Sequence, residues 1–172
     1  GEYTFHYNLW KNQIIKQEQN NWIGFCTYRR FWSQTSKLKK NFSLEKNILK
    51  IIPKEWENYD SVLVDPIYTN KTKFSKIIKH GKRVILNNPL LFFNKKNITI
   101  KIHFDMYHGY GNLDKAIDLL DVQDREKFRS YVDTKIMFNP YNMFICRNKK
   151  ILFEYYSNIF PWLERCESIF GF

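Results

Sequence analysis

The chain has 172 residues, which is enough for one domain with one hydrophobic core. Because 44% of the residues are hydrophobic and 18% are aromatic, the composition excludes an intrinsically disordered chain. The formal net charge of +11 favours polyanionic partners, which are nucleic acid, an anionic membrane surface or phosphorylated substrates. Lysines occur throughout the chain, so we interpret most of them as solvated surface residues.

The sequence shows neither a membrane span nor a secretory signal. No stretch reaches the roughly 18 consecutive apolar residues of a transmembrane helix, and no charged segment followed by an apolar one opens the chain. The three cysteines, Cys26, Cys146 and Cys166, lie in apolar surroundings and form no CxxC pair or metal-like spacing. These features predict unpaired thiols and a cytoplasmic location.

Up to about residue 90, helical and strand patterns alternate. Apolar side chains at helical spacing predict helices over about residues 3–19, 43–52 and 72–78, the last of which ends at Gly81. Short apolar runs bounded by polar residues predict buried strands at residues 22–27, 61–64 and 84–86.

The second half of the chain begins with an ambiguous segment. Residues 98–108 alternate like a strand, but Ile98, Ile102 and Asp105 with Met106 also fit one helix face, so both interpretations stay open. A glycine loop at residues 109–111 follows. Helices are then predicted over residues 113–120, 124–132 and 151–170, with an interruption at Pro161, and a strand at residues 142–145.

Because helices and strands alternate with few hairpin signals, we predict an α/β fold with a mostly parallel sheet flanked by helices. No repeat, low-complexity tract or linker divides the sequence. A single domain over residues 1–172 is therefore expected.

Two arginines follow the first predicted strand. The apolar run ends at Tyr28, Arg29 and Arg30. A guanidinium binds carboxylate or phosphate bidentately, and ligands of α/β sheets bind at the carboxyl ends of strands. The pair therefore either binds a phosphate or ion-pairs with Asp or Glu to hold a loop, and the sequence leaves both open.

The strong short motifs are absent: the sequence has no GxxxxGK[ST], GxGxxG, HExxH or GxSxG. It also lacks a DxD pair to hold a metal ion on a sugar nucleotide. We therefore assign no metal ligand and expect Arg29 and Arg30 to supply the positive charge for a diphosphate. Mg²⁺ or Mn²⁺ stays open as a cofactor.

Candidate catalytic residues surround the glycine loop. Asp105, His108 and Asp114 lie near it, and a carboxylate there can act as a general base. The alternative is that Asp105 is a surface residue, that Asp114 stabilises the first turn of a helix, and that His108 anchors the loop. Asn142 either orients a sugar hydroxyl or satisfies neighbouring backbone. Glu167 either pairs with an arginine, acts as a base or faces water.

Four ordered segments together resemble one known family. Residues 22–32 (WIGFCTYRRFW) resemble the YIGLCHYRRYF signature of a family of bacterial capsule and exopolysaccharide glycosyltransferases. Residues 7–12 (YNLWKN), 138–145 (FNPYNMFI) and 160–167 (FPWLERCE) are similar to that family's YWIWKN helix, NMFI strand and FPWLxxCE helix. Four matches in order across the chain are more specific than any one of them.

The resemblance implies a GT-A-like fold and a cytoplasmic enzyme near the inner membrane that transfers a sugar from a nucleotide donor to a growing glycan. Some members of that family use galactofuranose donors. The sequence departs from the signature at Thr27, where the motif usually has His. The resemblance also implies an incomplete domain, without the opening strand–helix unit for the nucleotide base and without the segment after the last helix.

The leading hypothesis is a glycosyltransferase with a UDP-sugar donor and a capsular or lipid-linked glycan acceptor. The expected site residues are Tyr28, Arg29 and Arg30 for the donor diphosphate, Asp105, Asp114 or Glu167 as the base, and His108 and Asn142 for the sugar. The alternative is a non-catalytic basic module that binds nucleic acid or an anionic membrane, with a steep dependence on salt.

Nucleic acid is not expected as a partner, because the aromatic residues lie at core-like helical spacing and are not interleaved with lysines as stacking platforms. A basic face on an anionic inner membrane is compatible with both hypotheses.

Overall fold

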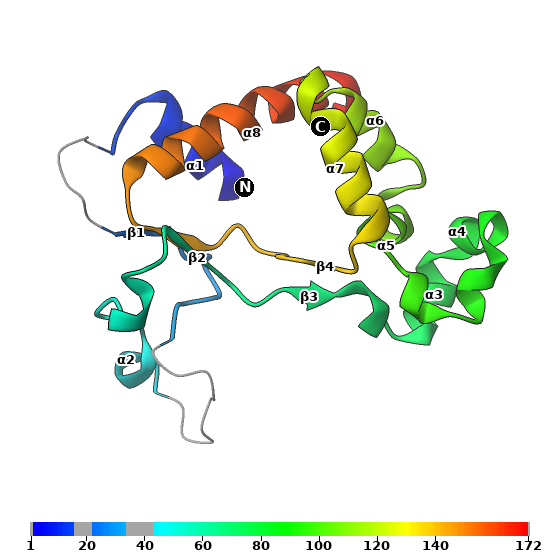
Figure 1. Cartoon of the computed structure of the whole chain (residues 1–172), viewed down its shortest axis with the longest axis horizontal. Coiled ribbons are helices and arrows are strands. Elements are labelled where there is room, and N and C mark those ends of the chain that lie inside the picture. Colours follow the sequence, from blue (N-terminus) through cyan, green and yellow to red (C-terminus); the bar gives the residue numbers. More distant parts are fainter. Residues whose placement is uncertain (1, 16–21, 34–42, 172) are drawn as a thin grey trace. The chain divides into compact units, whose positions relative to one another are not determined.

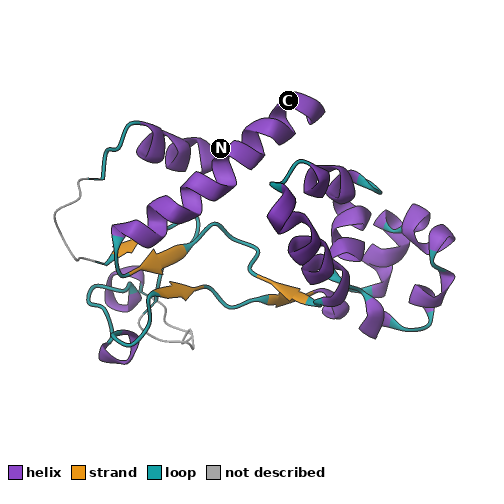
Figure 2. Ribbon diagram, turned by 45° about the horizontal axis from the view of Figure 1, so that its top comes forward, coloured by secondary structure: helices purple, strands orange, loops and turns teal. Residues whose placement is uncertain are grey.

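The computed structural model describes residues 2–15, 22–33 and 43–171. These residues form a mixed α/β structure that is mainly helical, with short strands in two small sheets (Figures 1 and 2). The chain divides into two compact units. Unit 1 comprises Gly1–Val64 and Tyr141–Ile159, and unit 2 comprises Asp65–Pro140 and Phe160–Phe172.

Unit 1 is built on a three-stranded antiparallel sheet of order β1-β5-β2. Its elements are α1 (Glu2–Lys11), β1 (Ile23–Gly24), α2 (Leu44–Asn47), the 3₁₀ turn η1 (Lys54–Trp56), β2 (Ser61–Leu63), β5 (Phe144–Cys146) and the first part of α8 (Lys149–Phe170). The central strand β5 is buried at Ile145 and Cys146. A Cβ at Gly24 would lie 2.9 Å from Ile145 Cγ1, so glycine permits the close approach of β1 to β5.

Helices α1 and α8 supply aromatic side chains to the core of unit 1. His6 and Tyr156 are buried and hydrogen-bonded to each other through the His6 Nδ1 atom and the tyrosine hydroxyl. The His6 ring also lies 4.6 Å from the Phe25 ring, between centroids. Burial lowers the pKa of His6 below its ordinary value, which keeps the imidazole neutral in this apolar core.

Unit 2 combines a group of helices with a two-stranded antiparallel ribbon. Its elements are β3 (Ile67–Tyr68), η2 (Thr69–Lys71), α3 (Phe74–His80), α4 (Lys82–Asn87), η3 (Pro89–Phe92), η4 (Lys95–Asn97), α5 (Ile100–His108), α6 (Asn112–Asp118), α7 (Val122–Thr134), β4 (Met137–Phe138) and the second part of α8. One core cluster joins Ile77, Val84, Leu91, Ile98 and Met106. A second joins Ile100, Leu113, Ile117 and Val132.

The predicted mixture of helices and strands is confirmed, but the prediction of a mostly parallel sheet is wrong for the described strands. Every strand pair among them is antiparallel. The residues 84–86, predicted as a strand, form part of α4, because Val84 packs beside Ile77 in a helical core. The ambiguous segment forms α5, whose N-terminus is capped by the Thr99 hydroxyl accepting from the Ile102 N–H at 3.4 Å.

Other boundaries follow the predictions in part. The helix that ends at Gly81 is confirmed, as are the two helices α6 and α7 and strands near residues 23, 61 and 144. The first helix ends at Lys11, and residues 16–21 lie outside the described part. Pro161 does not interrupt α8. The three cysteines are unpaired, as expected. Cys146 is buried, Cys166 is half-buried and Cys26 is exposed.

None of the described helices combines the length and the apolar character needed to cross a membrane.

Candidate functional site

The arginine pair lies on a tight turn that follows β1. The Arg30 N–H donates to the Thr27 carbonyl at 3.2 Å, and these two residues form an isolated β-bridge with Tyr28 and Arg29 between them. Thr27 and Phe25 are buried below the turn, and the Trp32 indole N–H donates to the Phe25 carbonyl at 2.9 Å. The buried residues Phe25 and Thr27 therefore anchor the turn, while Tyr28, Arg29 and Arg30 are exposed.

Each guanidinium of the turn lies against a tyrosine ring. Arg29 Cζ lies 4.6 Å from the centroid of the Tyr28 ring, and Arg30 Cζ lies 3.8 Å from that of Tyr141. Both arginines are exposed, and neither forms an ion pair with a carboxylate of the described residues. The loop-holding ion pair, which the sequence left open, is therefore not formed within the described part of the chain.

Two polar atoms near this turn are buried without a hydrogen-bond partner among the described residues. They are the Thr27 hydroxyl oxygen and the Asn142 side-chain nitrogen. Asn142 follows Tyr141, the ring on which Arg30 lies. Since buried polar atoms are nearly always paired, two unpaired ones near the same turn are an unusual feature of this region. We call Thr27, Arg29, Arg30, Tyr141 and Asn142, together with Tyr28, the arginine site.

Tyr141 is a residue that sequence reasoning missed. It lies in the FNPYNMFI segment, far from the arginines in sequence. Its signal is an aromatic residue three positions before the buried strand β5, and the structure leaves it exposed. The pairing with Arg30 depends on β5 lying beside β1, which the sequence does not indicate.

The two aspartates of the glycine loop belong to a charged network in unit 2. Asp105 is buried, accepts a hydrogen bond from the Gly111 N–H at 3.1 Å and lies 3.9 Å from Lys101 Nζ. Lys101 also donates to Asp114. Asp114 accepts from Arg129 at 2.7 Å. The idea that Asp105 is a surface residue is therefore wrong, whereas Asp114 does lie in the first turn of α6.

Burial sets the protonation of this network. Burial raises the pKa of the Asp105 carboxyl above its ordinary value, although the hydrogen bond from Gly111 and the charge of Lys101 act in the opposite direction. Burial alone would lower the pKa of Lys101, but its hydrogen bond to Asp114 and the nearby carboxylates raise that pKa overall. The network links α5, α6 and α7, so its first role is structural.

The raised pKa of Asp105 predicts a pH-dependent stability. The folded state binds this proton more tightly than the unfolded state does, so the stabilisation is complete below the ordinary pKa of 3.8 and is lost as the pH rises through the folded-state pKa. In Asp105→Asn this loss is absent. We expect the free energy of unfolding of Asp105→Asn, relative to the wild type, to increase from about pH 4 to about pH 7 in urea titrations. A relative stability that decreases over this range would contradict the assignment.

The remaining predicted residues are exposed. His108 lies at the end of α5, with its ring 4.6 Å from the Phe104 ring. The loop after it is anchored by its backbone, since the Asn112 side chain donates to the His108 carbonyl at 2.8 Å. Glu167 is exposed on α8 and forms no ion pair with the described residues. Thus Tyr28, Arg29, Arg30 and Asn142 belong to unit 1, and Asp105, His108, Asp114 and Glu167 belong to unit 2.

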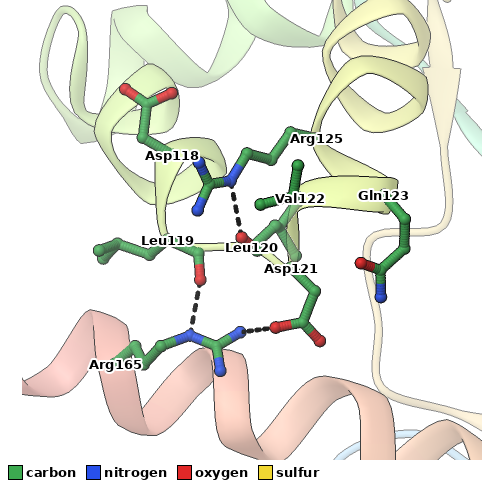
Figure 3. A pocket seen from close by; sticks show the side chains of 8 residues that line it. All are labelled: Asp118, Leu119, Leu120, Asp121, Val122, Gln123, Arg125 and Arg165. Carbon is green, nitrogen blue, oxygen red and sulfur yellow. Dashed lines mark hydrogen bonds and ion pairs between the residues drawn. The ribbon is translucent and has the colours of Figure 1, made fainter.

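A pocket of about 360 Å³ lies at the connection between α6 and α7 (Figure 3). Two arginines line it, and each donates a hydrogen bond to a backbone carbonyl of the connection. Arg165 donates to the Leu119 carbonyl at 2.6 Å and to Asp121 at 3.1 Å, and Arg125 donates to the Leu120 carbonyl at 2.7 Å (Figure 3). These contacts stabilise the connection, whereas Arg29 and Arg30 of the arginine site have no carboxylate partner among the described residues.

Among residues 2–15, 22–33 and 43–171, no three His, Cys, Asp or Glu side chains come together as metal ligands.

Comparison with known proteins identifies one family model. Residues 1–171 match the model described as a domain of unknown function, DUF4422. No curated protein matches the chain, and no solved structure does.

Proposed function

This chain belongs to the DUF4422 family, and on that premise we propose that it is a glycosyltransferase in which Arg29 and Arg30 bind the diphosphate of a nucleotide-sugar donor. One observation carries the proposal. Two adjacent guanidiniums are exposed on a turn with buried anchors, and neither has a carboxylate partner among the described residues.

The tyrosine contacts suit this role. A tyrosine ring close to a guanidinium restrains the arginine side chain, and the N–H donors of the guanidinium remain able to bind a phosphate. The edge of a guanidinium matches the oxygens of a phosphate bidentately. As the sugar is transferred, negative charge develops on the leaving diphosphate, and two fixed cations would stabilise it without a metal ligand set.

Asn142 lies in the same unit as the arginine pair. Its side-chain nitrogen is buried without a hydrogen-bond partner among the described residues, and it would donate to a sugar hydroxyl. The candidates for the base, which are Asp105, Asp114 and Glu167, and for a second sugar contact, which is His108, stay predictions from the sequence.

The resemblance of the four segments supports the finer parts of the proposal. These are a GT-A-like architecture, a UDP-sugar as donor, a capsular or lipid-linked glycan as acceptor, and a cytoplasmic enzyme at the inner membrane.

Calorimetric titration of the chain with a panel of UDP- and GDP-sugars, with and without Mn²⁺, tests the proposal. The matching nucleosides, which lack the diphosphate, serve as control ligands. We expect saturable binding of one sugar nucleotide and at least about tenfold weaker binding of its nucleoside, because the charge-assisted contacts to phosphate are missing. Binding of no donor by the folded chain, or equal binding of donor and nucleoside, would overturn the diphosphate role.

A further inference from the structure

Unit 2 contains a long segment without acidic residues. Between Asp65 and Asp105 the sequence has no Asp or Glu but nine Lys and Arg residues. Of these, Lys101 is paired with Asp114. No ion pair to a described carboxylate is formed by Lys71, Lys73, Lys76, Lys79, Lys82 or Arg83, all of which are exposed. Lysines occur throughout the chain, but Asp and Glu residues are missing from this segment. The segment therefore carries an uncompensated positive charge.

The same segment exposes large apolar side chains. Leu86 is 82% exposed, Leu90 is 70% exposed and Phe93 is 85% exposed, the last being the highest value among the large hydrophobic residues described. Their neighbours Val84 and Leu91 are buried in the core cluster of this part of unit 2. The inner side of the segment is therefore fixed in place while its outer side presents apolar groups to solvent.

Helical geometry puts Leu90 and Phe93 on one side of their turn and two cations beside Leu86. The Phe93 N–H donates to the Leu90 carbonyl at 3.1 Å, and residues three apart in a 3₁₀ turn lie on the same side of it. In α4, Lys82 and Arg83 precede Leu86 by four and three positions, so all three share one face of the helix.

We propose that Leu86, Leu90 and Phe93, with the flanking Lys79, Lys82 and Arg83, form a docking surface for an anionic lipid membrane. Apolar side chains that enter the headgroup region, next to cations that face lipid phosphates, are the combination that holds a protein at such an interface. The charge of the surface complements an anionic bilayer. The proposal is independent of the donor site, because it involves none of the residues of the arginine site.

The apolar groups favour lipid over nucleic acid. Two of the three are leucines, which cannot stack on bases. Binding to nucleic acid would rest on the cations alone and would not require Leu86 or Leu90. A lipid surface uses both kinds of side chain.

Vesicle sedimentation tests the proposal, with vesicles that contain phosphatidylglycerol compared with vesicles of phosphatidylcholine alone. We expect the chain to sediment only with the anionic vesicles. The triple variant Leu86→Ser/Leu90→Ser/Phe93→Ser should bind them at least about tenfold more weakly. The matched control, Ile51→Ser/Val122→Ser, changes side chains that are 78% and 74% exposed outside the segment and should bind as the wild type does.

A charge variant separates the two contributions. The variant Lys79→Glu/Lys82→Glu/Arg83→Glu should abolish binding to the anionic vesicles. The control variant Lys127→Glu changes an exposed lysine outside the segment without acidic residues and should leave binding intact. Circular dichroism checks that each variant keeps its helices. Equal binding of the apolar triple variant and its control would overturn the proposal, as would binding of duplex DNA without binding of vesicles. Because no sugar nucleotide is present, a failed donor titration leaves this test unaffected.

Discussion

Replacing Arg29 and Arg30 together with alanine is expected to weaken binding of the nucleotide-sugar donor by about 100-fold or more. Each charge-assisted hydrogen bond contributes about 1.5 to 3 kcal/mol, and the loss of two such contacts, about 3 kcal/mol at the lower limit, corresponds to about 150-fold in Kd. Calorimetric titration of the double variant with the donor that the wild type binds measures the change.

Two further variants sharpen this prediction. Arg30→Lys keeps the charge but loses the planar fork and its fit to the Tyr141 ring, so it should bind more weakly than the wild type and more tightly than Arg30→Ala. Lys11→Ala is the control, because Lys11 is an exposed cation of the same unit that lies over the Tyr7 and Trp10 rings. Unchanged donor affinity in the double variant, or an equal loss in Lys11→Ala, would contradict the role of the arginine pair.

Replacing Ile117 with alanine is expected to lower the free energy of unfolding by about 2 to 5 kcal/mol. Ile117 is completely buried and belongs to the cluster with Ile100, Leu113 and Val132. The truncated side chain would leave a cavity among helices α5, α6 and α7, which cannot close without moving these neighbours. Urea unfolding followed by far-ultraviolet circular dichroism measures the change.

The conservative variant Ile117→Val provides the comparison. It removes one methylene and should cost about 0.5 to 1.5 kcal/mol. A loss below 1 kcal/mol for Ile117→Ala, about the typical effect of any point substitution, would contradict the position of Ile117 at the centre of this core.

Sequence patterns predicted the helices well where a terminator or a capping residue is present. Gly81 follows the last residue of α3, and a Cβ added there would lie 2.6 Å from the Ile77 carbonyl oxygen, so glycine fits this position best. Thr99 decides the ambiguous segment in favour of a helix, since its hydroxyl caps α5. The strand prediction for residues 84–86 is wrong because a short apolar run shows no clear periodicity. The residues that pack against it as a helix lie elsewhere in the chain.

Local sequence patterns do not predict the order and direction of the strands in the sheet. Strand β5 lies between β1 and β2 although it follows them by some 80 to 120 residues, and each pairing is antiparallel. Alternation of helices and strands predicts parallel crossovers, but most of the segment between β2 and β5 forms a separate unit rather than a connection across one sheet.

The sequence predicts the arginines of the candidate site but not the side chains that surround them. Arg29 and Arg30 were identified from their place after an apolar run, whereas the absence of carboxylate partners among the described residues depends on tertiary structure. Asp105 was placed at the surface as one alternative, but packing of α5 buries it and a glycine N–H compensates it. Local sequence does not indicate which face of a short helix is covered.

Helix α8 has a consequence for how stability is distributed along the chain. Leu152 and Tyr156 bury its first part in unit 1, and Phe160 is buried in its second part, which belongs to unit 2. Pro161, next to this boundary, has no N–H to donate to the Ser157 carbonyl, so the ladder of backbone hydrogen bonds is interrupted there while the helix continues. Local unfolding of one half of α8 can therefore stop at the missing hydrogen bond. The stability of each half against local unfolding then depends on the core in which that half is buried.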